Sequence, residues 1–268
     1  MRELKREIIF ALVMALAYLP TLIWMWDRWF AKDSYYSHGI LIPFVTGYLI
    51  WQKRKELGDI EVSRSPWGIT LIVLGIAVYM LSSVFRIYFS SGFSMMIVIF
   101  GYVLHFFGVK FFKKILFPLS FLFFMFPLPM VVIVNISFKM KMFAAEIAKN
   151  VLNGMGLWAM RDGSIIKMPH AHVIVDDVCS GLRSLISLAA LGSIFAYWLE
   201  GPMWKRALLF LTTIPIAVLT NVCRVVFLAS VSEIWGPRFA TGALHDASGF
   251  MVFALAFFML FAAGKLIE

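Results

Sequence analysis

The chain has 268 residues, of which 62% are hydrophobic and 15% charged, and its formal net charge is +9. Soluble domains carry about a quarter charged residues, so this composition excludes an ordinary soluble protein and predicts a polytopic membrane protein. Two cysteines in such an apolar chain do not indicate a disulfide framework.

Eight stretches with little or no charge have about the length that crosses a bilayer, which takes roughly 20 apolar residues. They are residues 8–26, 34–52, 65–85, 87–109, 115–138, 184–199, 207–232 and 247–264. The first stretch follows basic residues, but it is too long for a signal peptide and lacks a small-residue cleavage site, so we predict an anchor helix. The sequence therefore predicts an all-α bundle of about eight transmembrane helices.

The basic residues are distributed unevenly between alternate loops. With a cytoplasmic N-terminus, the inner side holds Arg2, Lys5, Arg6, Lys53, Arg54, Lys55, Arg64, Lys110, Lys113, Lys114, Lys205, Arg206 and Lys265, and the short outer loops hold Arg28, Lys32, Arg86 and Arg238. This positive-inside bias predicts that both termini are cytoplasmic. We expect a multi-pass protein of the cytoplasmic (inner) membrane that contacts lipid and binds no nucleic acid.

The first outer loop, residues 27–38, ends in the polar and aromatic sequence Tyr35-Tyr36-Ser37-His38-Gly39. Two interpretations stay open: an interfacial aromatic belt with a capping serine, or a contribution to a functional site. In the third and fourth stretches, glycines predict close helix packing, and the lone His105 is interpreted as structural.

Between the fifth and sixth stretches the pattern changes. Pro118 and then Pro127-Leu128-Pro129 predict a kink or an end of the fifth helix. An apolar stripe at spacings of four and three follows, and it consists of Ile136, Met140, Phe143, Ile147 and Val151. It predicts an amphipathic helix in the outer interface, with a helix of a soluble core as the alternative.

Residues 157–178 predict a small outer β-hairpin, with a turn at Asp162-Gly163 and strands at 164–168 and 172–175. We treat residues of about 130–178 as an insertion in one integral-membrane domain over 1–268. His170 and His172 form an H-x-H pair that could bind a divalent metal, but no third histidine has a suitable spacing. We therefore predict no metal and no other cofactor.

Three reactive side chains are predicted at the outer face. Cys179 lies where the longest polar loop enters an apolar helix, and His245 opens the last stretch. Arg224 lies in the outer half of the seventh stretch, where a guanidinium costs roughly 2.5 to 3.5 kcal/mol and should face the bundle interior. The alternative for Arg224 is a structural hydrogen-bond hub with Asn221, one turn earlier, and Cys223 is interpreted as a packing residue.

These residue types suit acyl transfer. A thiolate attacks an amide carbonyl, a histidine takes the thiol proton and returns one to the leaving amine, and a fixed guanidinium stabilises the oxyanion. Arg183 and a helix N-terminus favour the thiolate of Cys179, while Asp177 opposes it. Arg183, Ser180, Asn221 and Asp177 are therefore predicted to support the site or to bind substrate, and Tyr36 and His38 are further candidates.

The motifs resemble those of the exosortase and archaeosortase family of membrane transpeptidases. The resemblance rests on Tyr36-Ser37-His38-Gly39, Cys179-Ser180-Gly181-Leu182-Arg183-Ser184, Asn221 to Arg224, and His245, in this order along nearly the whole chain. The Tyr-Ser-His-Gly loop resembles the bacterial exosortases, which are associated with extracellular polysaccharide systems.

The resemblance implies that Cys179 is the nucleophile and that Arg224 and His245 complete a triad. It also implies the partners: secreted proteins with a C-terminal PEP-CTERM-like tail, made of a short recognition motif, a hydrophobic helix and a basic end. Cleavage of this tail would leave an acyl-enzyme for an acceptor, whose identity the residues do not indicate. Because the tail is itself a membrane helix, we also expect a lateral opening near Cys179.

Two other classes of function remain as alternatives. A non-enzymatic transporter or scaffold of polysaccharide assembly would place ionisable groups at several depths along a pore. A membrane acyltransferase or glycosyltransferase would use a carboxylate or histidine base without a required thiol. The predicted cluster at one face favours the peptidase, and a membrane-impermeant thiol reagent distinguishes it from the transferase.

Overall fold

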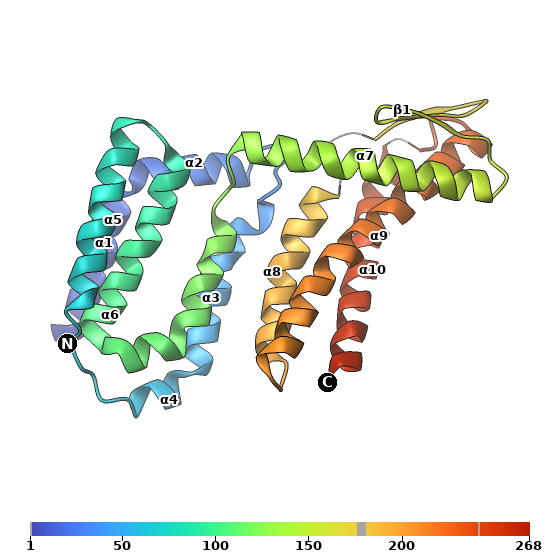
Figure 1. Cartoon of the computed structure of the whole chain (residues 1–268). Helices are drawn as coiled ribbons and strands as arrows, with labels where there is room; N and C mark the ends of the chain where they lie inside the picture. Colours follow the sequence, from blue (N-terminus) through green and yellow to red (C-terminus); the bar gives the residue numbers. More distant parts are fainter. Residues whose placement is uncertain (1, 176–180, 241) are drawn as a thin grey trace. The chain divides into compact units, whose positions relative to one another are not determined.

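The computed structural model describes residues 2–175, 181–240 and 242–268, and the chain forms two units, Met1–Pro129 and Met130–Glu268. The first unit contains α1 (Arg2–Ala17), α2 (Leu19–Trp29), η1 (Ser37–Leu41), α3 (Ile42–Gln52), α4 (Arg54–Gly58), α5 (Trp67–Val84), α6 (Tyr88–Phe121) and η2 (Leu122–Met125). The second contains α7 (Met130–Gly154), β1 (Met160–Asp162), β2 (Ile165–Lys167), β3 (His172–Ile174), α8 (Leu182–Trp198), α9 (Met203–Trp235) and α10 (Ala243–Ile267) (Figure 1). The prediction of one domain is left open by this division.

The prediction of a mostly helical membrane protein is confirmed, but eight spans are not. Among the described residues, four helices are long and apolar enough to cross a membrane: α5, α6 with η2, α9 and α10. The pair α1 and α2, bent by 74°, would make a fifth span. Apolar windows report composition but not where the chain bends, so their number can differ from the number of long helices.

Three predicted stretches illustrate this difference. The window 34–52 begins as the short helix η1, and α3 has only 11 residues, which cover about 16 Å of a roughly 30 Å hydrocarbon layer. The windows 87–109 and 115–138 meet in α6, whose backbone leaves the helical region at Gly108, with φ 87° (Figure 1). The helix breaks at this glycine and not at Pro118, which lies inside the helix. Pro127 follows the end of η2, as predicted.

Close glycine contacts join α5 and α6, as predicted. A Cβ atom at Gly101 would lie 2.7 Å from the Gly68 carbonyl oxygen and 2.8 Å from the backbone nitrogen of Ile72. His105, on the same helix, contacts the Ser65 carbonyl oxygen through Nδ1 at 3.1 Å, which agrees with its structural interpretation. The two backbones therefore approach as closely as only glycine permits.

We expect Gly101→Ala to destabilise this helix pair by about 1–3 kcal/mol, because the new methyl group meets rigid backbone atoms. The matched control is Gly47→Ala in α3, where no described atom lies within 4 Å of a Cβ. This control should be neutral or stabilising by up to about 1 kcal/mol. Thermal unfolding of both variants in detergent measures the difference, and equal melting temperatures would contradict the prediction.

The amphipathic helix is confirmed as α7, but the face that packs against the protein is not the predicted apolar stripe. The predicted apolar stripe is largely exposed, with Ile136, Phe143 and Val151 at 37%, 56% and 41%. The face buried against the protein is built from smaller residues, including Ala145 and Ala148, and it packs with Val225 and Ala229 of α9 in one core. A soluble-core helix would bury its stripe, so the exposed stripe favours the interfacial alternative.

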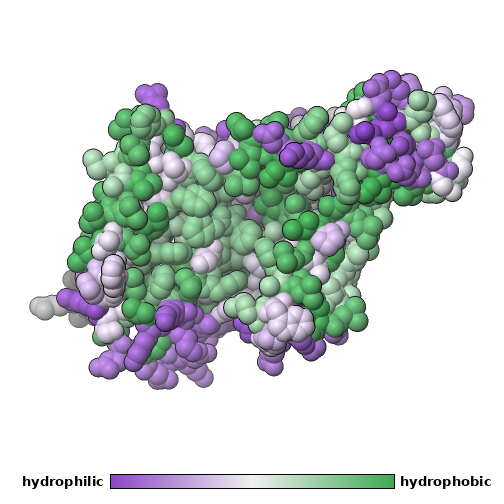
Figure 2. Space-filling view, in the orientation of Figure 1, coloured by the Kyte–Doolittle hydropathy of each residue, from purple (hydrophilic) through white to green (hydrophobic). Residues whose placement is uncertain are grey.

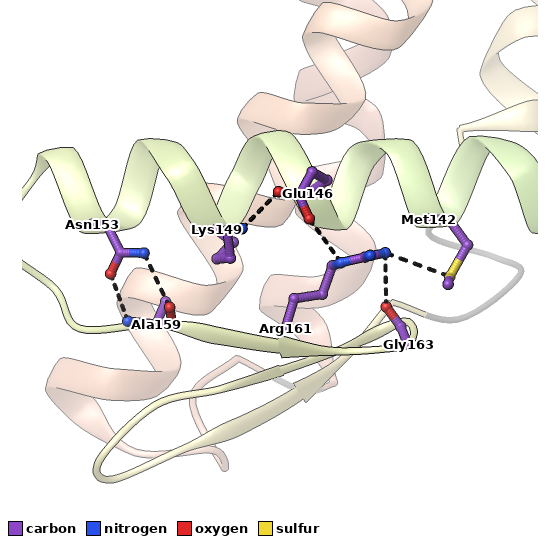
Figure 3. Close-up of polar contacts among 7 residues, drawn as sticks. All are labelled: Met142, Glu146, Lys149, Asn153, Ala159, Arg161 and Gly163. Carbon is purple, nitrogen blue, oxygen red and sulfur yellow. Dashed lines mark hydrogen bonds and ion pairs between the residues drawn. The ribbon is translucent and has the colours of Figure 1, made fainter.

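The predicted hairpin is confirmed and carries one strand more than expected. β1, β2 and β3 form an antiparallel sheet in that order, and β2 joins β3 through a turn at Pro169-His170. Polar contacts fasten β1 to α7 (Figure 3): the Asn153 amide exchanges two hydrogen bonds with the Ala159 backbone, and Arg161 Nε lies 2.8 Å from Glu146 Oε2. Hydrogen bonding from Lys149 and the charge of Arg161 lower the pKa of Glu146, so the carboxylate stays ionised.

In the second unit, α8, α9 and α10 lie side by side below α7 and the sheet (Figure 1). These helices share a core of aliphatic residues that includes Leu188, Leu209 and Leu260. Figure 2 shows hydrophobic surface over these helices and hydrophilic residues gathered around the strands. The strands therefore mark the polar end of this unit, and α8 and α10 both begin near it.

Candidate active site

Arg224 of α9 and His245 of α10 lie in direct contact, although 21 positions separate them in sequence. Arg224 Nη2 lies 3.3 Å from His245 Nε2 and donates a hydrogen bond of 3.1 Å to the His245 carbonyl oxygen. A guanidinium has donors only, so Nε2 of the imidazole accepts this bond. The contact is therefore a hydrogen bond only for the neutral tautomer that carries its proton on Nδ1.

Ser248, which the sequence analysis missed, holds this pair in place. Its hydroxyl accepts a hydrogen bond of 2.9 Å from Arg224 Nε and donates one of 2.6 Å to the His245 carbonyl oxygen. The side chain is only 3% exposed. One sequence signal points to Ser248. It follows His245 by three residues in a predicted helix, which places both side chains on one face.

The N-terminus of α8 meets α9 one turn from Arg224. Gly181 precedes α8 with φ 80°, and a Cβ at this position would lie 2.8 Å from the side-chain carbon Cγ of Asn221. Asn221 is 3% exposed. Its contact with Gly181 therefore fixes where α8 begins, whereas the hydrogen bonds of Arg224 described above go to α10 and not to Asn221.

One pocket of about 490 Å³ joins these elements. It lies between α8 and α10, and its lining includes Arg183, Ser184, Arg224, His245 and Phe250. Two guanidinium groups reach it, and no acidic side chain is among the described residues that line it. Guanidinium groups are side chains that stabilise a thiolate or an oxyanion.

The remaining candidates have different places. Cys179, Ser180 and Asp177 lie outside the described residues. Tyr36 and His38 belong to the first unit, where their rings stack at 6.0 Å and Tyr36 is buried, so their part in the site stays a prediction. Cys223 is exposed, which differs from the packing role we expected.

The two histidines of the H-x-H pair have different places in the structure. The His170 backbone N–H and Nδ1 both contact the Glu233 carboxylate, with 2.8 Å from Nδ1 to Oε1. This contact joins the β2–β3 turn to α9, while His172 begins β3. Within the described part of the chain, no group of three or more His, Cys, Asp or Glu side chains could hold a metal ion.

A family model described as transmembrane exosortase matches residues 26–262. The chain belongs to the transmembrane exosortase family. The resemblance drawn from the motifs is thereby confirmed, and the matched region contains every motif on which it rested. No curated protein and no solved structure matches this exosortase. Family membership and the apolar helices together make it a multi-pass membrane protein.

Proposed function

We propose that this exosortase is a membrane-embedded cysteine transpeptidase with its active site on the extracytoplasmic face of the inner membrane. Its substrates would be secreted proteins with a C-terminal membrane tail, and Cys179 would be the nucleophile. The observation that carries the proposal is the contact between Arg224 and His245 inside a pocket that Arg183 and Ser184 also line. These last two residues follow Cys179 by only four and five positions.

Chain connectivity supports the proximity of Cys179 to this pair. Two peptide bonds separate it from Gly181, so their Cα atoms lie within about 7 Å of each other. Gly181 packs on Asn221, one helical turn from Arg224. This connection to Gly181 supports the assignment of Cys179 as the nucleophile of the site.

The neutral imidazole supports a specific order of steps. When a substrate carbonyl takes over the Arg224 Nη2 donor, the lone pair of His245 Nε2 becomes free to accept the thiol proton. The thiolate then attacks the carbonyl carbon, and Arg224 stabilises the oxyanion. The C–N bond breaks, His245 returns the proton to the leaving amine of the tail, and the substrate carbonyl remains on sulfur as a thioester. An acceptor nucleophile, deprotonated by His245, releases the product and the thiol.

The position of the pocket also suits a substrate that is itself embedded in lipid. Its lining descends along α8 to Ser187 and along α10 to Phe253. Phe250, at its rim, is 81% exposed and offers an aromatic surface to a hydrophobic partner. The gap between α8 and α10 is therefore our candidate for the lateral opening through which the tail enters.

The proposal is tested with a co-expressed secreted reporter that carries a candidate C-terminal tail, in membranes treated with an impermeant thiol reagent. Because Cys223 is exposed, the assay uses Cys223→Ala, so that Cys179 is the one remaining cysteine. We expect Cys223→Ala to cleave the reporter as wild type does, and the reagent to reduce this cleavage at least tenfold, since blocking the nucleophile removes the covalent route. Cleavage that resists the reagent in this variant would favour the transferase class, and absence of cleavage with several tails would favour a scaffold.

A further inference from the structure

Among the described residues, no further strand pairs with the outer edge of β3. β3 is the last strand of the sheet, and the backbone bonds Met168 N to Ala171 O and Val175 N to Ser164 O show which of its residues pair with β2. Hydrogen-bonded pairs alternate in antiparallel sheets, so residues 171, 173 and 175 face β2. The N–H and C=O groups of His172 and Ile174 therefore point away from β2, toward the opposite edge.

A second pocket, of about 310 Å³, follows this edge. Four consecutive residues of the strand region line it, from His172 to Val175. Successive side chains point to opposite faces of a sheet, so a pocket that touches all four lies along the strand edge and not over one face. The opposite wall is formed mainly by α9, through Val225, Leu228 and Ser232.

This edge pocket and the candidate active site share a lining residue. His245 lines it, and His245 also lines the pocket that contains Arg224. The strand is held firmly beside α9, because the His170–Glu233 contact joins the β2–β3 turn to α9 and the contacts of Figure 3 fasten β1 to α7. The edge is thus preorganised, and a chain lying along it runs toward the imidazole.

We propose that the free edge of β3 binds the extended segment of the substrate that precedes its membrane tail, by adding a strand to the sheet. The inference rests on the proposed function and specifies how that substrate is positioned. Main-chain hydrogen bonds to His172 and Ile174 align the segment, as in other cases of strand addition. At about 3.3 Å per residue, the edge from 172 to 175 aligns roughly four substrate residues before the scissile bond reaches His245.

Photocrosslinking tests where the segment lies. A photoreactive phenylalanine analogue is placed at Ile174 on the proposed edge, at Met160 on β1 as the matched control, and at Phe250 in the active-site pocket. Ile174 and Met160 are 57% and 54% exposed, so exposure alone predicts equal crosslinking. The full chain carries Cys179→Ala, which keeps the substrate intact, and the reporter tail is the probe.

We expect crosslinks from Ile174 and Phe250 that clearly exceed those from Met160. Crosslinks from Phe250 without Ile174, or equal crosslinks from Ile174 and Met160, would overturn the strand site while leaving the peptidase intact. Loss of crosslinks at both Ile174 and Phe250, together with no cleavage by wild type, would remove both proposals.

A proline substitution tests whether the backbone makes the contact. Ile174→Pro removes an N–H that points away from β2, so the pairing within the sheet is kept, and proline is tolerated at such edge positions. We expect Ile174→Pro to lower cleavage at limiting substrate about tenfold, which corresponds to the loss of one hydrogen bond. Ile174→Ala keeps the N–H and should therefore have a smaller effect. Unchanged membrane abundance and melting temperature show that the fold is retained. Equal effects of the two variants, or wild-type cleavage by Ile174→Pro, would contradict strand addition.

Discussion

Arg224→Lys is expected to reduce reporter cleavage by about 10²–10³-fold, the usual cost of removing a preorganised oxyanion donor. Arg224 uses two different nitrogens, Nε toward Ser248 and Nη2 toward His245, and a lysine ammonium cannot occupy both positions. The variant keeps the positive charge and has a similar cost of membrane insertion, so abundance should change little. The rate of tail release at matched abundance measures the effect.

The matched control for this prediction is Arg206→Lys, which makes the same change on the same helix. Arg206 lines neither of the pockets that His245 lines. Its replacement should leave cleavage near the wild-type rate. If Arg224→Lys cleaved as well as this control, a positive charge alone would suffice, and the fixed fork geometry of the guanidinium would have no role in catalysis.

The sequence predicted much of the arrangement around Arg224 because the free energy of placing one charged side chain in lipid is high and depends on that residue alone. That cost requires Arg224 to face other helices, and the alternation of spans places the start of the last helix at the same level. The structure brings Arg224 and His245 together as this reasoning expected. It also shows that α7 and the hairpin lie where the apolar stripe and the Asp162-Gly163 turn indicated.

Other features depend on contacts between segments and leave only weak signals in the sequence. The role of Ser248 becomes clear only from the structure, where its hydroxyl lies between Arg224 and the His245 carbonyl. At the Gly108 break, the carbonyl oxygen of Ser63 lies so close that it leaves no room for a Cβ at this position. The free edge of β3 requires the register of all three strands, which alternation of residue types does not determine.

These contacts also change how the triad chemistry is understood. The sequence alone predicts separate roles for His245 and Arg224, each acting on the substrate. In the structure, the guanidinium occupies the imidazole nitrogen that must accept the thiol proton. In the proposed mechanism, substrate binding and base activation are therefore linked, because the carbonyl that takes the donor of Arg224 also releases the base.

His245→Gln separates these two roles of the imidazole. The glutamine amide oxygen can accept the hydrogen bond from Arg224, and the backbone carbonyl that Arg224 and Ser248 contact is unchanged. The amide cannot take up a proton, so we expect cleavage to fall by about 10²–10⁴-fold, the usual contribution of a general base. Reporter cleavage at matched abundance measures this loss, and melting temperature in detergent checks that the Arg224 contacts persist.

His245→Ala is the comparison that decides between the two roles, because it removes both the base and the acceptor. If proton transfer is the main role, the glutamine and alanine variants should be similarly inactive, while the alanine variant alone loses stability as Arg224 loses a partner. If the glutamine variant cleaves near the wild-type rate and the alanine variant does not, His245 acts only by orienting Arg224. The proton of Cys179 would then need another acceptor, and the order of steps proposed above would be wrong.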